Sequence, residues 1–169
     1  EHAYELIEGG TERYLGIVLQ YPEIGPEQVQ RTIHLGGAAA QTGQVGVGVL
    51  GVGNFARAVL LPAITRCPGF RPVVLCSAHG TSATHSGRKL GFATATTDEA
   101  PVLDNPDVDC VFVVTRHNEH ARQVAEAIRA RKHVFVEKPL CPNEEELAQS
   151  QQPLAGAGDP APRLRAGFN

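Results

Sequence analysis

The stretch VGVGVLGVGNFA, residues 45–56, decides the fold. Its first six residues form a short apolar run ending in glycines, which is typical of a buried parallel strand. A helix is predicted from about Asn54, and we expect Pro62 to kink or split it. Between strand and helix, Gly51, Gly53 and Ala56 have the spacing GxGxxA. This order of strand, glycine turn and helix is the pattern in which such a turn binds a nucleotide.

The glycine turn has a specific physical reading. Gly51 permits the tight turn, Gly53 leaves space for a pyrophosphate to approach the backbone, and a small residue after them lets the helix pack on the strand. The free N–H groups at the helix start, around Asn54 and Phe55, would then face the phosphates. We therefore assign these four residues to cofactor binding. Two alternatives stay open, a turn that serves packing alone and a methyltransferase that binds S-adenosylmethionine.

Strand and helix patterns alternate through the rest of residues 44–140. We expect an amphipathic helix over residues 119–131, because its apolar residues recur with the spacing i, i+3, i+4, i+7. Thr81 is expected to cap a helix that runs to Leu90, and Asp98 a short one. Further strands are predicted at 72–77, 93–96, 108–115 and 133–137, with a sixth possible at 163–168. The fold class is therefore α/β, a doubly wound parallel sheet of the Rossmann type.

The segment before the first strand differs from the rest. Residues 3–8 are helix-like and residues 14–19 strand-like, but residues 1–43 are too few for a core of their own. We interpret them as a junction segment and residues 44–169 as the dinucleotide-binding domain. The sequence contains no methionine, so we expect an excised part of a longer protein. A substrate domain after residue 169 is expected to be absent from it.

The second strand leads into the loop that should meet the cofactor ribose. A dinucleotide site expects an acid here, about 20 residues after the glycine turn, and none is present. Ser77, Thr81 and the Gly80 amide offer neutral groups for a ribose or a 2′-phosphate, and Arg88 and Lys89 follow. An ordinary strand–helix loop explains the same residues. The cofactor is thus NAD or NADP, and the sequence leaves the choice open.

The segment 115–120, TRHNEH, follows the strongest strand. In an open α/β sheet, ligands bind at the carboxyl ends of the strands near the switch point. We expect Thr115 and His120 to line the nicotinamide side of the site. His117, Glu119 and His120 could be read as metal ligands, but their spacing matches no metal signature and a fourth ligand is lacking. We assign no metal; a plain role at the helix start is the remaining alternative.

Glu137, Lys138 and Pro139 end the fifth predicted strand. An ammonium beside a nicotinamide could polarise a carbonyl or hydroxyl, or assist proton transfer. We therefore assign Lys138 as the catalytic residue and place Glu137 with the cofactor-binding residues. Pro139 would stiffen the turn, and a cis bond is possible before it. The alternative is a surface lysine paired with Glu137.

Composition excludes other classes of partner. The formal net charge is −3 and the basic residues are scattered, which gives no basis for binding nucleic acid or an anionic membrane. The four cysteines form no CxxC pair, and the N-terminal residues lack the pattern of a signal peptide. We expect a cytoplasmic protein without disulfides.

Three stretches together resemble the glucose-fructose oxidoreductase/inositol dehydrogenase/MocA family. They are GVGNFARAVLLPAI, DVDCVFVVTRHNEHARQVAEAIRARKHVFVEKPL and the ending RAGFN, and the resemblance covers about residues 45–169. In that family the glycine turn binds NAD(P), and the lysine of the EKP segment, here Lys138, lies at the nicotinamide and takes part in catalysis. The family's T-P-N-x-x-H segment keeps Thr115 and His120 here, while Arg116 and His117 replace its proline and asparagine.

The resemblance implies the function of the intact protein. It would transfer hydride between a nicotinamide cofactor and a secondary alcohol or ketone of a sugar or cyclitol-like small molecule. This chain of 169 residues would be inactive alone. Assembly into homo-oligomers would use the missing C-terminal domain. Residues 3–23 also look like the end of a zinc-type alcohol dehydrogenase domain, as in bi-domain oxidoreductases. The alternative is a non-catalytic nucleotide-binding or assembly module.

Overall fold

A computed structural model describes residues 2–10, 15–21, 30–37, 42–141, 143, 145–148, 153, 156 and 158–167. The chain divides into two compact units, residues 1–30 and residues 31–169. Among the described residues, no helix is both long enough and apolar enough to cross a bilayer.

The first unit contains one described helix. Helix α1 spans His2–Gly9 and ends before Gly10, whose φ is +56°, which confirms the predicted helix over residues 3–8. The strand predicted at 14–19 is wrong for its described residues, because residues 15–20 form no strand. The side chains of Leu15, Val18 and Leu19 are exposed, and a strand needs a neighbour to pair its backbone groups. Tyr14 lies outside the described residues.

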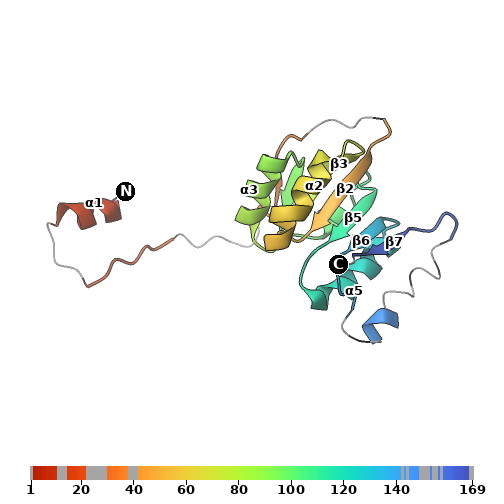
Figure 1. Ribbon diagram of the computed structural model, residues 1–169. Coiled ribbons are helices and arrows are strands. Elements are labelled where there is room, and N and C mark those ends of the chain that lie inside the picture. Colours follow the sequence, from red (N-terminus) through yellow and green to blue (C-terminus); the bar gives the residue numbers. More distant parts are fainter. Residues whose placement is uncertain are drawn as a thin grey trace. The chain divides into compact units, whose positions relative to one another are not determined.

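The second unit is built on one seven-stranded sheet with the order β1-β4-β3-β2-β5-β6-β7. Every pairing is parallel except that of β1 with β4, so the predicted doubly wound α/β fold is confirmed (Figure 1). The strands are β1 (Thr32–His34), β2 (Val45–Leu50), β3 (Phe70–Cys76), β4 (Thr94–Thr96), β5 (Cys110–Val113), β6 (His133–Val136) and β7 (Leu164–Ala166).

Strand β1 belongs to the segment that the sequence analysis interprets as a junction. Its three residues pair antiparallel with β4, and Thr32 Oγ1 lies 3.0 Å from Thr96 Oγ1. The compact unit that holds the sheet accordingly begins at Arg31, earlier than the predicted boundary after residue 43. The possible sixth strand at 163–168 is present as β7.

The helices alternate with the strands. They are the π-helix η2 (Ala56–Leu60), α2 (Leu61–Arg66), α3 (Gly80–Leu90), α4 (Ala100–Leu103) and α5 (His117–Arg129). Pro62 lies in the first turn of α2, so the split expected there takes the form of a change from π to α hydrogen bonding. This agrees with the missing N–H of proline.

Two predicted helix starts need correction. Thr81 lies inside α3 rather than capping it: His79 is the N-cap, and its carbonyl accepts hydrogen bonds from the amides of Ser82 and Ala83. Helix α5 begins at His117, two residues before the predicted start at residue 119. Asp98 does bond the start of α4, because its Oδ1 accepts from the Ala100 amide at 3.2 Å.

The core has two parts, one on each face of the sheet. Alternate residues of β5 and β6 enter different clusters: Val111, Val113, Val134 and Val136 pack with α5, while Phe112 packs with residues of α2. Helices α2 and α3 pack against β3 and β4, and α5 packs against β5 and β6 (Figure 1). Burial on both faces explains why these strands read as continuous apolar runs.

Candidate dinucleotide site

The carboxyl ends of the strands form a single edge. In the sheet register, Leu50 lies beside Cys76 and Val113, and Val113 lies beside Val136. The residues that follow these strands therefore come out at one edge, as predicted. Strands β2 and β5 are the point where the chain reverses its direction across the sheet, and a ligand crevice is expected there.

Gly51 is required by the backbone at this switch point. Its φ is +108°, and an ideal Cβ would lie 2.5 Å from the carbonyl oxygen of Val114. Its amide donates to the Cys76 carbonyl at 2.9 Å. A side chain would thus be strained by φ and would clash with the end of β5. Gly51 brings the turn against β5.

Gly53 has a different role, because an ideal Cβ there meets no atom within 4 Å. The helical segment begins at Asn54, and the Gly53 carbonyl accepts a hydrogen bond from the Arg57 amide at 3.0 Å. Asn54 and Phe55 are both exposed. Open space above a glycine, next to the first turn of a helix, fits a diphosphate. Asn54 Oδ1 meanwhile accepts from Arg57 Nη2 at 2.7 Å.

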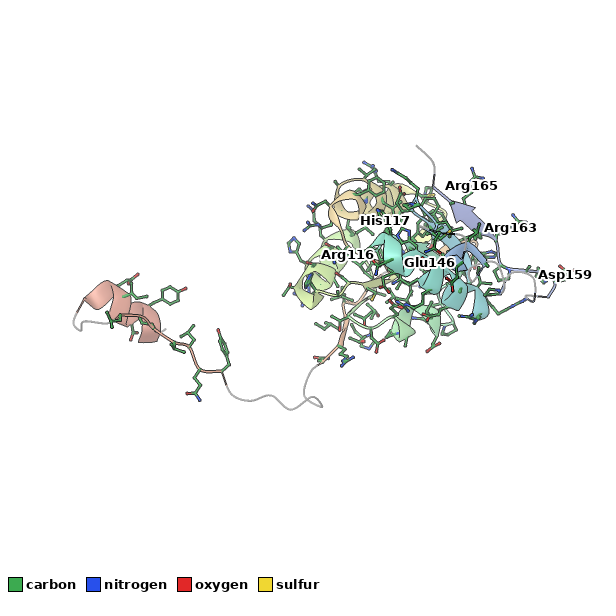
Figure 2. The ribbon with its side chains drawn as sticks, turned by 90° about the horizontal axis from the view of Figure 1, so that it is seen from below. Arg116, His117, Glu146, Asp159, Arg163 and Arg165 are labelled. Atoms are coloured by element: carbon green, nitrogen blue, oxygen red, sulfur yellow. The ribbon has the colours of Figure 1, made fainter. Side chains whose placement is uncertain are left out.

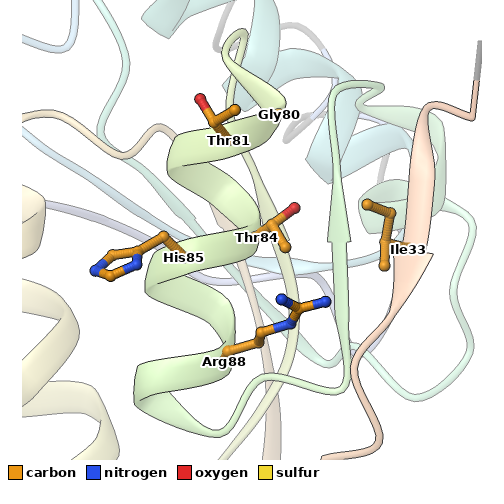
Figure 3. Close-up of a pocket in the computed structure, with 6 residues that line it drawn as sticks. All are labelled: Ile33, Gly80, Thr81, Thr84, His85 and Arg88. Atoms are coloured by element: carbon orange, nitrogen blue, oxygen red, sulfur yellow. The ribbon is translucent and has the colours of Figure 1, made fainter. Parts of the chain in front are cut away.

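The residues that the sequence places near the cofactor ribose lie in the loop after β3 and along α3. The half-buried Ser77 hydroxyl accepts from the His79 amide at 3.4 Å. Thr81, Arg88 and Gly80 line an open pocket of about 410 Å³ between α3 and β1, together with Ile33, Thr84 and His85. In Figure 3, Thr84 and Arg88 point toward the strand that carries Ile33, whereas His85 points away. None of the described residues that line this pocket carries a carboxylate.

Cys76 lies below that loop at the end of β3. Burial, followed by the charges of Glu99 and Asp98, raises the pKa of its thiol to about 12. The thiol is therefore protonated at neutral pH and behaves as a small apolar group. The described cysteines are free, and Cys110 is only partly buried.

Thr115 follows β5 and is held by two groups. Its hydroxyl donates to Gln123 Oε1 at 2.5 Å, and its carbonyl oxygen lies 3.2 Å from Nε2 of His120. Gln123 is only 2% exposed, so a buried amide fixes the hydroxyl. Thr115 itself is half-buried and follows β5 at the carboxyl edge of the sheet.

The position of His120 requires a correction. Its side chain has no exposed surface, so the ring does not line an open crevice. Instead Nδ1 lies 2.7 Å from the Pro139 carbonyl and Nε2 faces Thr115. The ring connects the loops after β5 and β6. Within the described residues, no three His, Cys, Asp or Glu side chains are grouped to share a metal.

Replacing His120 by leucine is expected to destabilise the fold by about 1–3 kcal/mol. Leucine fills much of the space, but the carbonyl of Thr115 or Pro139 that accepts from the imidazole N–H loses this donor. Urea denaturation followed by circular dichroism measures the loss. The exposed His85 is the control, since His85→Leu should change stability by less than about 0.5 kcal/mol. Equal effects at the two histidines would contradict this role for His120.

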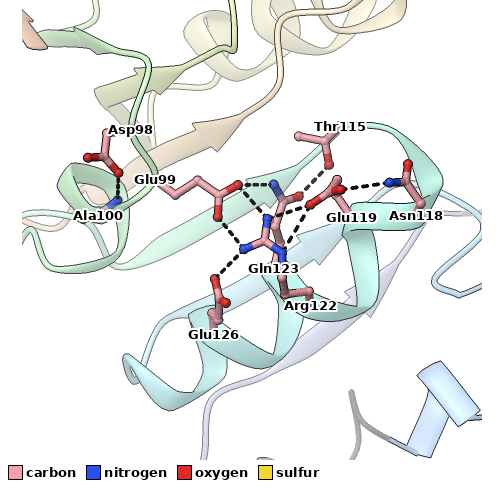
Figure 4. Close-up of polar contacts among 9 residues, drawn as sticks. All are labelled: Asp98, Glu99, Ala100, Thr115, Asn118, Glu119, Arg122, Gln123 and Glu126. Atoms are coloured by element: carbon pink, nitrogen blue, oxygen red, sulfur yellow. Dashed lines mark hydrogen bonds and ion pairs between the residues drawn. The ribbon is translucent and has the colours of Figure 1, made fainter. Parts of the chain in front are cut away.

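A polar cluster that the sequence does not predict lies beside Thr115. Arg122 donates to both oxygens of Glu99, each at 2.9 Å, and also pairs with Glu119 and Glu126 (Figure 4). Gln123 Nε2 donates to Glu99 at 2.7 Å. The i, i+3 and i, i+4 spacing of Arg122 with Glu119 and Glu126 is readable from sequence. The contact with Glu99 is not, because it joins segments that are distant in the chain.

Lys138 and Glu137 lie at the end of β6. The Glu137 amide continues the ladder by donating to the Val113 carbonyl at 2.9 Å. The side chain of Lys138 is exposed, and the structure shows it no ion pair with Glu137 among the described residues. The bond between Lys138 and Pro139 is cis, which confirms the possibility raised from the sequence. Lys138 thus shares an edge with Thr115 and the glycine turn.

The larger cavity lies at the other edge of the sheet. It measures about 850 Å³ and is lined by the first residues of strands, among them Val45, Phe70, Cys110 and His133. Arg163 and Arg165 belong to its lining, whereas Arg116 and His117 lie at the start of α5 (Figure 2). The larger of the two described cavities therefore lies at the opposite edge of the sheet from the topological switch point.

Similarity to known proteins agrees with this geometry. Residues 45–160 match the family described as "Oxidoreductase family, NAD-binding Rossmann fold". A scyllo-inositol 2-dehydrogenase (NAD(+)) of Bacillus subtilis is 30% identical over 68% of this chain and 34% of its own length. A 1,5-anhydro-D-fructose reductase of Ensifer adhaerens is 34% identical over 55% of this chain and 28% of its own length. The chain thus spans about a third of the length of such relatives.

Solved structures show the same fold. A 3-ketoreductase from Actinomadura kijaniata in complex with NADP and TDP-benzene superposes with a TM-score of 0.59 at 28% identity, covering 65% of this chain and 35% of that one. A scyllo-inositol dehydrogenase from Lactobacillus casei with NAD(H) and scyllo-inositol reaches 0.67 at 24% identity, over 74% and 36%. With residues 45–160 matched, the chain belongs to the glucose-fructose oxidoreductase/inositol dehydrogenase/MocA family of oxidoreductases, as its NAD-binding Rossmann domain.

Proposed function

We propose that this domain binds NAD(H) or NADP(H) at the carboxyl edge of its sheet and supplies the catalytic lysine for hydride transfer. The substrate would be a secondary alcohol or ketone of a sugar or cyclitol-like molecule. The single observation that carries the proposal is the open space over Gly53 at the switch point, with Thr115 and Lys138 on the same edge. The relatives named above act on substrates of this class.

The residues at the carboxyl edge of the sheet bind the cofactor or support the loops that bind it. Gly51, Gly53 and the amides of Asn54 and Phe55 hold the diphosphate, because a helix start offers free N–H groups to anions. Ser77 bonds the adenosine ribose. Thr115 lines the nicotinamide side, while His120 and Glu137 support the loops that carry it and Lys138.

Lys138 performs the acid–base part of the reaction. The bound nicotinamide supplies the hydride acceptor or donor. In the direction of oxidation, the neutral amine of Lys138 would accept the hydroxyl proton of the substrate while the substrate carbon gives its hydride to the nicotinamide. In the reverse direction the resulting ammonium would polarise the carbonyl and return the proton to its oxygen. The exposed position of Lys138 at the strand end leaves it free to meet a substrate.

Catalysis is proposed to need a further domain besides this chain. The matched parts make up only 28% and 34% of the two relatives, so we infer that a further domain completes the substrate pocket and that the chain alone does not turn over. Assembly into homo-oligomers and a cytoplasmic location belong to this proposal. So does a fusion to a zinc-type alcohol dehydrogenase domain before the sheet, which rests on the resemblance of residues 3–23.

Titration of the chain with NADH and NADPH, followed by nucleotide fluorescence, tests the proposal. Saturable binding of at least one nucleotide is the expected result. S-adenosylmethionine in the same concentration range serves as the control for the methyltransferase alternative. Binding of adenosylmethionine without binding of either dinucleotide would refute the assignment.

A further inference from the structure

The polar groups around Thr115 form a chain in which each hydrogen bond fixes the direction of the next. It begins at Glu99, beside α4. Burial alone would raise the pKa of Glu99, but hydrogen bonds from Arg122 and Gln123 and the charge of Arg122 outweigh burial, so the pKa lies below its ordinary value. Glu99 is therefore ionised at neutral pH. An ionised carboxylate only accepts hydrogen bonds.

The second member of the chain is Gln123. Its amide has a donor end and an acceptor end, and the contact with Glu99 decides which end faces which neighbour. Because Glu99 accepts only, the NH₂ group must face it, and Nε2 indeed lies 2.7 Å from Glu99 Oε1. The carbonyl end then faces Thr115. With 2% exposure, Gln123 has little access to water that would satisfy a flipped amide.

The third member is the hydroxyl of Thr115. Gln123 Oε1, an acceptor at 2.5 Å, takes its only proton. Figure 4 shows the chain running from Glu99 through Gln123 to Thr115. The lone pairs of Thr115 Oγ1 remain, and these can only accept.

We propose that Thr115 Oγ1 is a dedicated hydrogen-bond acceptor for the nicotinamide half of the cofactor, and that Gln123 and Glu99 are the positioning residues that give it this polarity. The inference rests on the proposed function. An ideal Cβ at Gly51 would lie 2.9 Å from the Thr115 amide nitrogen, so Thr115 borders the phosphate turn. A ligand oxygen without a proton is disfavoured there, and an N–H or O–H is favoured.

The nicotinamide half offers two donors of this chemistry, the carboxamide NH₂ and the ribose hydroxyls. A comparison of NADP⁺ with its 3-acetylpyridine analogue distinguishes them, because the analogue keeps the ribose but carries a methyl group in place of the NH₂. The NAD⁺ pair is measured in parallel. The readouts are the dissociation constant of each ligand by calorimetry and the ratio of the two, each compared between variant and wild type so that intrinsic differences between the ligands cancel.

Four variants of the full chain make the test specific. Thr115→Val removes the acceptor, and Thr115→Ser keeps it. Glu99→Gln keeps the shape but allows the Gln123 amide to turn round, so that Thr115 no longer has a fixed polarity. Glu126→Gln is the matched control, because it removes a charge from the same Arg122 without touching Gln123.

The expected effect is a change of about threefold to tenfold, the range for one neutral hydrogen bond. If the carboxamide is the donor, Thr115→Val weakens the binding of NADP⁺ relative to its analogue, so the ratio of the two dissociation constants changes by this factor. If the ribose is the donor, Thr115→Val weakens both ligands equally. In either case Thr115→Ser binds both ligands as wild type does. Glu99→Gln changes the same dissociation constants as Thr115→Val, whereas Glu126→Gln leaves them unchanged.

Three results would overturn the inference: Thr115→Val binding both ligands as tightly as wild type, Glu99→Gln indistinguishable from wild type, or Glu126→Gln reproducing Glu99→Gln. Each is distinct from failure of the proposed function, in which the wild-type chain binds neither NAD⁺ nor NADP⁺. A merely structural role of Glu99 would lower the free energy of unfolding without changing the dissociation constant of either ligand.

Discussion

Replacing Gly53 by aspartate is expected to weaken NAD(P) binding at least about a hundredfold while leaving the fold as stable as wild type. No atom lies within 4 Å of the new Cβ, so the side chain enters the space proposed for the diphosphate. There it blocks the phosphates and repels them; two unit charges about 4 Å apart interact by roughly 4 kcal/mol near a protein surface. Nucleotide fluorescence titration measures the binding, and urea denaturation the stability.

Two neighbouring changes serve as controls for this result. Gly53→Ala adds an uncharged methyl group to the same space and should weaken binding much less. Gly51→Ala should instead destabilise the chain, because its Cβ would lie 2.5 Å from the Val114 carbonyl oxygen and its φ is +108°. If Gly53→Asp bound NADH and NADPH as tightly as wild type, the diphosphate would lie elsewhere.

The second large effect is expected at Lys138. In a protein that carries this domain together with a substrate domain, Lys138→Ala should lower kcat by roughly 10²–10⁴, the usual contribution of a positioned acid or base. The dissociation constant of the cofactor should change little, because Lys138 follows β6, which is separated by β5 from the strand that leads into the turn at Gly53. Steady-state kinetics with a polyol substrate, followed by NAD(P)H absorbance, provides the measurement.

Lys132 is the matched control, because it precedes the same strand at its opposite end. Its Nζ donates to the Asn105 carbonyl at 2.8 Å. Lys132→Ala is therefore expected to lower stability but not kcat. Undiminished turnover in Lys138→Ala would instead favour a nucleotide-binding or assembly module without hydride chemistry in this domain.

The parts of the site that follow from sequence are those encoded over a few consecutive residues. Gly51 and Gly53 stand between an apolar run and a helix start, and this order alone fixes their place at a strand end. Lys138 follows an apolar strand in the same way. Because all parallel strands end at one edge, the sequence also predicts that these residues share that edge, and the register agrees.

The parts that sequence could not provide depend on contacts between distant segments. Strand β1 has three residues, and within the part of the chain that the structure describes it pairs with β4. The bond from Gln123 to Glu99 joins α5 to the start of α4. His120 matches the family pattern, yet only the fold shows that its ring is buried between two carbonyls. Such long-range polar contacts leave no local periodicity in the sequence.

A two-dimensional NMR titration of the isotopically labelled chain with NADPH and with NADH tests the central claim most directly. The diphosphate is predicted to shift the amide signals of residues 53–56, and the nicotinamide half that of Thr115. Amides that line the cavity at the opposite edge, such as those of Phe70 and Arg163, should stay unchanged. Shifts confined to that cavity, with the glycine turn unaffected, would contradict a dinucleotide site at the switch point of the sheet.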